Sequence, residues 1–455
     1  MTQNGMNRRE FLKYAGAGLA TLAIPASLMA AGDRQPNIIL IVADDLGYAE
    51  LGCQGSKDIP TPNTDSIAKN GVRFTSGYVS CPVCSPTRAG LITGRYQQRF
   101  GHEFNPGPAG QASENFGLPL AETTLASRLK SAGYTTGIVG KWHLGYDEKY
   151  RPLDRGFDEF FGFLGGAHSY VDSASEALNP IMRGTQKVEE KEYLTDALAR
   201  EAVAFIERHR QRPFFLYLTF NAVHSPLQAP DKYLARFSGI TDQKRRTFAA
   251  MLSAMDDAIG DVLASVRKND LEEDTLIFFI SDNGGPTPQT TSRNDPLRGY
   301  KGQVYEGGIR IPFMVQWKGH LPAGKVRDKP VISLDIVPTA CAVAGAKTDN
   351  ARFDGVDLMP FLTGKSSRAP HDVLYWRFGD QYAIRDGDWK LVKTPNGTEL
   401  FDLKADIGEQ TDLASKSPDR VKELDARLMK WDSKLAEPLW KTQRNRKAGR
   451  KKQVS

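Results

Sequence analysis

The chain has 455 residues, 40% of them hydrophobic and 25% charged, so it can bury a large core and form one big domain with a smaller one beside it. Its formal net charge of +6 comes from its two ends, because residues 441–455 hold seven basic and no acidic side chains and residues 1–31 add two positive charges. The body between them, residues 32–440, carries a net charge of −3, which argues against a nucleic acid as partner. The tail at 441–455 is predicted to be disordered and solvated, with weak binding to polyanions as the alternative.

The first 31 residues are typical of an export signal. Asn7-Arg8-Arg9-Glu10-Phe11-Leu12-Lys13 resembles the twin-arginine motif, and a mildly apolar stretch rich in Ala and Gly follows it as far as Ala31. We therefore expect a signal peptide over 1–31, the twin-arginine translocase as a partner, and the bacterial periplasm or exterior as the destination. The stretch is too short and too weakly hydrophobic to predict a permanent membrane span, and an ordinary amphipathic helix is the alternative interpretation.

Strand and helix signals alternate along the body of the chain. Short apolar runs predict strands, and amphipathic runs predict helices. The strands are expected at 37–42, 135–139, 213–220, 275–281 and 311–316, and the helices at 64–70, 122–132, 193–209 and 242–268. This rhythm predicts an α/β fold with a large parallel or mixed β-sheet sandwiched by helices.

The pattern changes near residue 366. Four short alternating runs separated by turns predict an antiparallel sheet, at 372–377, 381–385, 389–393 and 399–402. An amphipathic helix is expected at 418–435. We therefore expect a catalytic domain over 32–365 and a small C-terminal α+β subdomain over 366–440.

Polar side chains come directly after the predicted strands of the large sheet. Ligands and catalytic groups of open α/β sheets gather beyond the carboxyl ends of the strands, so these side chains are expected to share one site. They are Asp44 and Asp45 after the first strand, Lys141 and His143 after the second, His224 after the third, and Asp282 and Asn283 after the fourth.

Two of these groups offer only oxygen ligands. Asp44, Asp45, Asp282 and Asn283 suit a hard cation, Ca²⁺ before Mg²⁺, rather than zinc or copper. The alternative is that Asp-Asp and Asp-Asn are ordinary loop and cap residues after strands.

Residues 84–95 contain an unusual string: Cys84-Ser85-Pro86-Thr87-Arg88, continued by Leu91 and by Thr93-Gly94-Arg95. It resembles the signature of the type I sulfatases, which belong to the alkaline phosphatase superfamily. The resemblance extends to Lys141-Trp142-His143, to His224 and to the segment 300–312 with Lys301, and it covers roughly residues 36–320. The alternative is a buried structural cysteine before a helix that opens at Pro86.

The resemblance implies a definite chemistry. A maturation enzyme would convert Cys84 to Cα-formylglycine (3-oxoalanine), an aldehyde whose hydrate attacks sulfur and later expels sulfate. Arg88 and His143 would orient and activate its hydroxyls, and His143 would take the second proton. Lys141, His224 and Lys301 would bind the sulfate, His224 or Lys301 would protonate the leaving alcohol, and Asp44, Asp45, Asp282 and Asn283 would hold calcium. A helix beginning near Cys84 would help, since its free N–H groups favour an anion.

Three other cysteines remain, at Cys53, Cys81 and Cys341. A disulfide between Cys53 and Cys81 is possible, although the spacing gives it no support.

These observations favour an exported, calcium-dependent sulfuric ester hydrolase acting on a sulfated carbohydrate. Two alternatives stay open. One is a phosphonate or phosphate ester hydrolase on the same scaffold, because phosphoryl and sulfuryl groups are both tetrahedral and anionic. The other is a sulfoglycan-binding protein without turnover, which would follow if Cys84 were never converted. The choice of sugar is expected to depend on the loop at 165–176 and on the C-terminal sheet.

Overall fold

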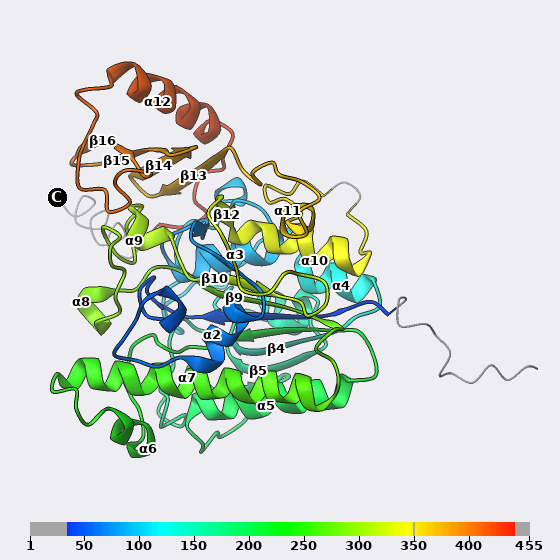
Figure 1. The fold of residues 1–455 in the computed structure, drawn as a ribbon. Helices are drawn as coiled ribbons and strands as arrows, with labels where there is room; N and C mark the ends of the chain where they lie inside the picture. Colours follow the sequence, from blue (N-terminus) through cyan, green and yellow to red (C-terminus); the bar gives the residue numbers. More distant parts are fainter. Residues whose placement is uncertain (1–33, 349–350, 442–455) are drawn as a thin grey trace, which may run out of the picture. The chain divides into compact units, whose positions relative to one another are not determined.

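The apolar runs of the body lie side by side in the middle of one ten-stranded sheet (Figure 1). The structure is a computed structural model that describes residues 34–348 and 351–441, and the fold is that of the unit from Gln35 onward. The strands follow one another across the sheet in the order β11 (Lys325–Arg327), β2 (Val72–Phe74), β10 (Phe313–Gln316), β9 (Thr275–Ser281), β1 (Asn37–Ala43), β8 (Phe214–Thr219), β4 (Thr135–Lys141), β5 (Glu159–Phe163), β6 (Met182–Arg183) and β7 (Gln186–Lys187).

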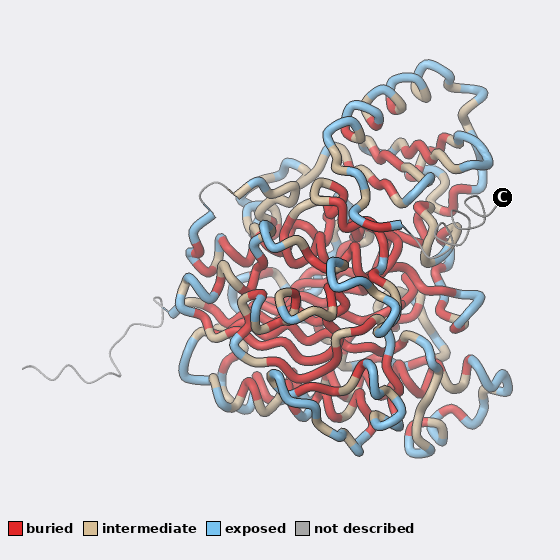
Figure 2. Tube along the Cα trace, turned by 180° about the vertical axis from the view of Figure 1, so that it is seen from behind, coloured by how far each residue is buried: buried red, intermediate tan, exposed pale blue. Residues whose placement is uncertain are grey.

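The sheet is mixed, as predicted. Strands β9, β1, β8, β4 and β5 run parallel to one another, whereas β10 runs antiparallel to both β9 and β2, and β6 runs antiparallel to β5. Every residue of β1, β8 and β9 is buried, which is why their sequences are continuous apolar runs rather than alternating ones. Figure 2 shows this buried centre as a band of strands.

Helices cover both faces of the sheet (Figure 1). On one face, Ile39 and Ile41 of β1 share a core with α2 (Pro62–Lys69), α5 (Leu194–His209) and α7 (Gln243–Lys268). On the other face, Ile38 and Leu40 share a core with α3 (Cys84–Thr93), α4 (Leu125–Ser131) and α10 (Ile336–Ala344). Four-residue helices occur in the connections, as α6 (Asp231–Leu234), α8 (Thr287–Thr290), α9 (Glu306–Ile309) and α11 (Met359–Leu362), and a small sheet pairs β3 (Gly77–Tyr78) with β12 (Val331–Ile332).

The C-terminal region forms the antiparallel sheet that its alternating pattern predicts. Its strands follow in chain order, as β13 (Val373–Phe378), β14 (Gln381–Asp386), β15 (Trp389–Thr394) and β16 (Gly397–Asp402). Helix α12 (Pro418–Asp432) packs Leu424 and Leu428 into the same core as α3 and α10. The domain boundary near residue 366 remains a prediction.

Helix ends differ from the predictions where a cap decides them. Helix α4 begins at Leu125 rather than 122, because the Thr124 side chain accepts a hydrogen bond from the Ser127 N–H at 3.1 Å. Helix α3 begins at Cys84, as expected for a helix that starts near this residue, and Pro86 is tolerated in its first turn because it loses no intrahelical bond there.

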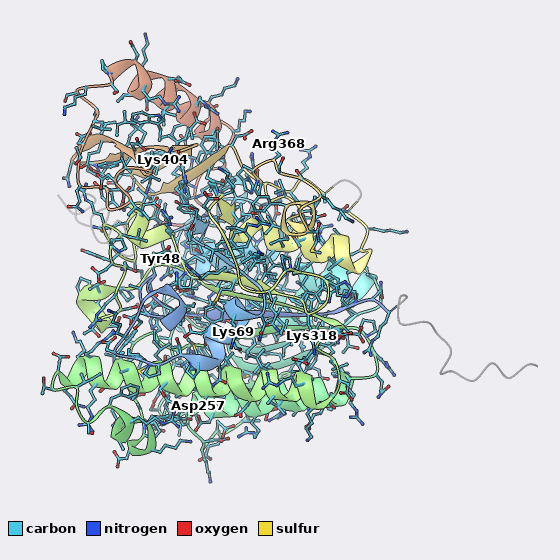
Figure 3. The ribbon with its side chains drawn as sticks, in the orientation of Figure 1. Tyr48, Lys69, Asp257, Lys318, Arg368 and Lys404 are labelled. Atoms are coloured by element: carbon cyan, nitrogen blue, oxygen red, sulfur yellow. The ribbon has the colours of Figure 1, made fainter. Side chains whose placement is uncertain are left out.

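The possible Cys53–Cys81 disulfide is not formed. All four cysteines, which lie in the described part of the chain, are free, and the Cys53 sulfur lies 3.9 Å from the sulfur of Met314. Among the described helices, none combines the length and the apolar character that a membrane crossing needs. The predicted signal at 1–31 and the tail beyond Lys441 lie outside the described residues. Charged side chains such as Lys69, Lys318 and Lys404 lie on the outside of the protein (Figure 3).

Candidate active site

The carboxyl ends of three adjacent parallel strands meet at one edge of the sheet. Strand β1 lies between β8 and β9, with Ala43 opposite Ser281 and Val42 opposite Thr219. The residues that follow these strands are joined by backbone bonds, since the Asp44 N–H donates to Ala222 O at 2.9 Å and the Asp282 N–H to Ala43 O at 3.0 Å. The predicted convergence of polar side chains at this edge is therefore confirmed for these segments.

Two of the expected site residues have unusual backbone conformations. Asp45 and His143 adopt φ values of 63° and 59°, in the left-handed region that non-glycine residues seldom occupy. Their surroundings hold them there: the Ser85 hydroxyl donates to the His143 carbonyl at 2.6 Å, and the Asp45 N–H donates to Asp282 Oδ1 at 3.2 Å. Strain of this kind gathers at functional sites.

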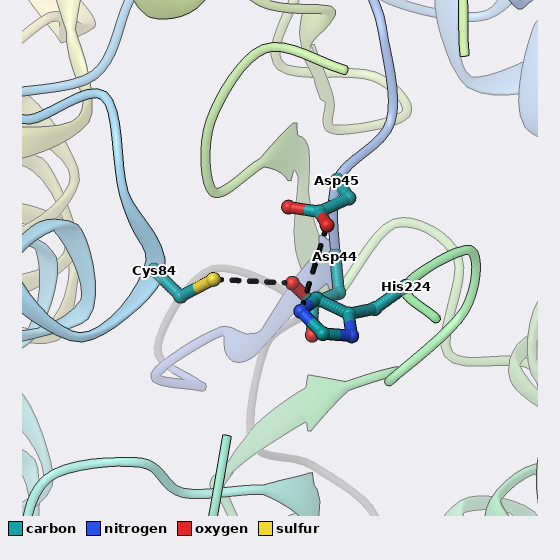
Figure 4. Close-up of side chains that lie close together, drawn as sticks. All are labelled: Asp44, Asp45, Cys84 and His224. Atoms are coloured by element: carbon teal, nitrogen blue, oxygen red, sulfur yellow. Dashed lines mark hydrogen bonds and ion pairs between the residues drawn. The ribbon is translucent and has the colours of Figure 1, made fainter. Parts of the chain in front are cut away.

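Cys84 is the first residue of α3 and lies in the middle of the site. Its Sγ is 3.5 Å from Asp44 Oδ1 and 3.1 Å from Lys301 Nζ (Figure 4 shows the contact with Asp44). The residue is only 1% exposed, and burial raises the pKa of its thiol to about 12 although Lys141 and Lys301 oppose that shift. A thiol that stays protonated is a poor nucleophile and a poor metal ligand.

Arg88 contacts several residues around Cys84, and the role toward the nucleophile that the family resemblance implies stays a prediction. Its Nε donates to Asp282 Oδ2 at 3.0 Å, and its Nη2 lies 2.8 Å from the same oxygen as an ion pair. Its Nη1 donates to the Lys141 carbonyl at 3.1 Å and to the Thr219 hydroxyl. Arg88 is fully buried in these contacts, one turn below Cys84. It stands behind the site and fixes Asp282 and the end of β4.

The remaining charges form close ion pairs. Lys141 pairs with Asp44, and Lys301 Nζ lies 2.6 Å from Asp45 Oδ1. Burial alone would raise the pKa of Asp44, but Lys141 and the other surrounding cations hold it well below its usual range. Burial, with the repulsion of Asp44, raises the pKa of Asp282 to about 6. Three carboxylates and three cations therefore meet within one buried cluster.

The site opens to solvent at His224 and Lys301. Their side chains are 18% and 16% exposed, whereas those of Asp44, Arg88 and Lys141 are at 0%. His224 Nε2 lies 3.6 Å from Asp45 Oδ2 (Figure 4). These two side chains are thus the predicted site residues that a ligand from solvent can touch first.

His143 presents an unused polar atom. Its buried Nδ1 has no hydrogen-bond partner among the described residues, and burial, together with the positive charge of Lys141, lowers the pKa of the imidazole well below its usual value. A neutral imidazole with a free nitrogen can accept a proton.

The oxygen-rich group fits a hard cation. The compact cluster that could hold a metal ion shares only Asp44 and Asp45 with the expected oxygen set. One ligand atom each from Asp44, Asp45, Cys84 and His224 lies within 4.8 Å of the others. The Asn283 amide donates from Nδ2 to Asp45 Oδ1 at 2.7 Å, and its buried Oδ1 has no partner among the described residues. Two of the four expected ligands also contact Arg88: Asp282 Oδ2 accepts a hydrogen bond from its Nε at 3.0 Å, and Asp44 Oδ2 lies 3.9 Å from its Nη2. Carboxylate and amide oxygens are the donors that Ca²⁺ and Mg²⁺ prefer.

Comparisons with known proteins agree with this geometry. The family model described as Sulfatase matches residues 36–346, and the one described as N-sulphoglucosamine sulphohydrolase, C-terminal, matches residues 300–435. The chain belongs to the sulfatase family. As a sulfatase it is an enzyme, a sulfuric ester hydrolase.

Named relatives cover most of this sulfatase. Bovine arylsulfatase A is 36% identical over 85% of the chain and 80% of the relative, and mouse N-acetylgalactosamine-6-sulfatase is 34% identical over 84% and 76%. A solved structure of Ps i-CgsB in complex with k-i-k-neocarrahexaose superimposes with a TM-score of 0.85 at 38% identity, covering 90% of this chain and 95% of that one. The phosphonate monoester hydrolase of Agrobacterium radiobacter, at 21% identity and a TM-score of 0.66, shares the fold.

Some residues of the site could not be found from the sequence. Thr219, which holds Arg88, ends an apolar strand and looks like a core residue. Ser85 was visible only as part of the signature, yet its Oγ lies 2.7 Å from His102 Nε2 and its N–H donates to Asn105 Oδ1 at 3.0 Å. No local pattern connects 102 and 105 with residue 85.

Proposed function

We propose that this sulfatase removes sulfate from a sulfated carbohydrate, using a nucleophile derived from Cys84. The observation that carries the proposal is the position of Cys84 at the start of α3, between Asp44 and Lys301. Two names support a carbohydrate: a relative acts on an N-acetylgalactosamine sulfate, and a structure 38% identical to this chain was solved with a neocarrahexaose.

The buried, protonated thiol favours conversion of Cys84 to Cα-formylglycine over direct use of the sulfur. The hydrated aldehyde would offer two hydroxyls on one carbon: one bonds to sulfur as the S–O bond to the sugar breaks, and loss of the proton from the other restores the aldehyde and expels sulfate. Cys84 is the first residue of α3, and the positive end of the helix dipole favours negative charge at this carbon.

The side chains around Cys84 would bind the sulfate, position one another and transfer protons. Lys141 and Lys301 supply positive charge for the sulfate, and Arg88 keeps Asp282 and the Lys141 backbone in place. His143, with its free Nδ1, accepts the proton of the second hydroxyl. His224 and Lys301, on the solvent side, bind the ester and donate a proton to the leaving sugar oxygen.

Asp44, Asp45, Asp282 and Asn283 would hold a calcium ion, or less favourably magnesium, because their oxygens are hard ligands and Asn283 Oδ1 is free. When bound, the cation supplies positive charge that draws electrons from the sulfuryl group. The twin-arginine-like start of the chain supports export to the periplasm or the exterior.

The test is a screen of desulfation on defined sulfated saccharides, using protein produced together with a formylglycine-generating enzyme. Matched phosphate and phosphonate esters are assayed in parallel, and Cys84→Ala is the negative control. We expect turnover on a sulfated saccharide only. Faster turnover of the phosphorus esters would favour the phosphonate or phosphate ester hydrolase, and tight saccharide binding without turnover would favour a sulfoglycan-binding protein.

A further inference from the structure

A second cluster of buried charges lies behind the segment that carries Lys301. Lys390 comes from β15 of the C-terminal sheet, and its Nζ lies 2.8 Å from Glu306 Oε1 and 2.8 Å from Glu409 Oε1. All three side chains are 0% exposed. An ammonium group in such a place has lost all its hydration, so its contacts with the two carboxylates must replace it.

The carboxylates of this cluster fix backbone as well as side chains. Glu306 Oε2 accepts from the Tyr78 hydroxyl at 2.7 Å and from Arg310 at 3.0 Å. Glu306 is the first residue of α9, and its N–H donates to Glu409 Oε2 at 2.7 Å. Glu409 itself has a φ of 52°, a conformation that its contacts must maintain. The start of α9 is therefore held by the C-terminal region.

The segment from Arg298 to Gly308 is closed upon itself. The Gly307 N–H donates to Arg298 O at 2.7 Å, and a Cβ at Gly308 would lie only 1.9 Å from Gln303 O, so only glycine allows this approach. Lys301 lies within this closed loop. A shift at Glu306 would therefore move Lys301 with it.

Two further contacts join the loop to the C-terminal region on either side of Lys301. The Gln381 side chain, from β14, donates to Gly302 O at 2.9 Å. Arg298 donates to Glu399 Oε1 and to Glu409 O, both at 3.0 Å. On the far side of the loop, Gly308 O accepts the N–H of Gly284, the residue after Asn283. The loop thus lies between the C-terminal sheet and the expected cation site.

We infer that Lys390, with Glu409 and Gln381, positions Lys301 for sulfate, so that the C-terminal sheet sets part of the active-site geometry. The inference rests on the proposed function, in which Lys301 binds sulfate. Burial of an ion pair adds little stability compared with apolar packing of the same volume, but it does fix the position of the groups that it joins.

The test is a mutant cycle read out by the binding of inorganic sulfate, measured by calorimetry in the presence of Ca²⁺. The variants are Lys301→Ala, the charge-balanced pair Lys390→Met/Glu409→Gln, and all three changes together. We expect the pair and Lys301→Ala each to weaken sulfate binding about 10-fold, and the triple variant to bind no more weakly than Lys301→Ala. Effects that multiply in the triple variant, or a folded pair variant with unchanged sulfate binding, would overturn the inference.

Lys393→Met is the matched control, because Lys393 lies on the same strand and pairs with Asp425 of α12; it should leave sulfate binding unchanged.

If the pair variant does not fold, Gln381→Met replaces it in the mutant cycle. We expect Gln381→Met to weaken sulfate binding about 3-fold in the wild-type background and not at all in the Lys301→Ala background. A wild-type protein that neither binds sulfate nor turns over a sulfated saccharide would count against the proposed function. If the wild type binds and turns over its substrate and Lys301→Ala weakens sulfate binding as expected, an unchanged pair variant would contradict only the role of Lys390.

Discussion

The cluster around Cys84 and the cluster around Lys390 use the same kinds of side chain, yet they differ in access to solvent. The Cys84 cluster reaches solvent through His224 and Lys301 and leaves His143 Nδ1 and Asn283 Oδ1 without partners among the described residues. The Lys390 cluster is closed, and Lys390, Glu306 and Glu409 are at 0% exposure.

Perturbed pKa values do not separate these two clusters. The pKa of Asp282 is raised to about 6 by burial and by Asp44, and that of Glu409 to about 7, chiefly by burial. What distinguishes the site for reaction is its opening to solvent at His224 and Lys301. A closed cluster can hold position but cannot receive a substrate.

The largest expected effect is at the open cluster. Cys84→Ser offers one hydroxyl where the matured residue offers two, so it can attack sulfur but cannot expel sulfate by collapse to an aldehyde. We expect steady turnover to fall at least about 1,000-fold, with at most one alcohol released per enzyme and sulfate retained on residue 84. The measurement is product per site over time, with mass analysis of the peptide that contains residue 84.

Cys53→Ser is the control for this change, because Cys53 contacts Met314 away from the cluster, and it should keep wild-type turnover. Sustained turnover of Cys84→Ser near the wild-type rate would show that residue 84 is not the nucleophile.

Removal of the cation tests the carboxylates of the same cluster that are expected to hold it. Treatment with a chelator should abolish turnover and added Ca²⁺ should restore it, while Asp45→Ala should lower turnover by about 100-fold and weaken metal binding. Asp196→Ala, whose carboxylate pairs with Lys232 on the surface of α5, should change neither. Full activity of protein shown by elemental analysis to be free of metal would refute the cation site.

Stability should respond in the opposite order to activity. Lys390→Met leaves two buried carboxylates without their cation, so we expect the free energy of unfolding to fall by about 3–5 kcal/mol. Lys301→Met should cost less, although it removes most activity, because Asp45 keeps the Asn283 amide and His224 as partners. Urea unfolding of both variants measures the difference. Equal losses of unfolding free energy would mean that the two clusters contribute equally to stability.

The smallest effect concerns pH and the closed cluster. Burial, opposed by Lys390 and aided by Glu306, raises the pKa of Glu409 from 4.5 to about 7. The folded carboxyl therefore binds its proton more tightly than the unfolded one, and this contribution to stability is present below pH 4.5 and is lost as the pH rises to about 7. Relative to Glu409→Gln, the wild type should lose at most about 1.4 kcal/mol per pH unit in that range.

Urea midpoints of the two proteins between pH 5 and 8 provide the comparison. Parallel stability curves would show that Glu409 does not titrate in this window.

Much of the open cluster was predictable, because each apolar run ends in a polar residue and parallel strands share an edge. Asp44 and Asp282 were found in this way. The roles of Thr219 and Lys390 were not, since a threonine that ends an apolar strand resembles core and a lysine in an alternating strand resembles a solvent-facing residue. Their partners lie far away in the sequence: Thr219 binds Arg88, 131 residues away, and Lys390 binds Glu306, 84 residues away. The pattern of residues in a short window cannot predict contacts between residues so far apart in the sequence.

Cys84 is 1% exposed once the protein has folded, and its contact Lys301 lies 217 residues later in the chain. During synthesis, therefore, the cysteine leaves the ribosome long before the segment that closes over it. If Cys84 is converted as proposed, the maturation enzyme, itself a folded protein, can reach residue 84 only in this interval or in a chain that has unfolded again. The fraction of molecules that become active is then set by a race between modification and folding, and slower folding or slower translation beyond residue 88 would raise the yield of active enzyme without any change in the finished structure.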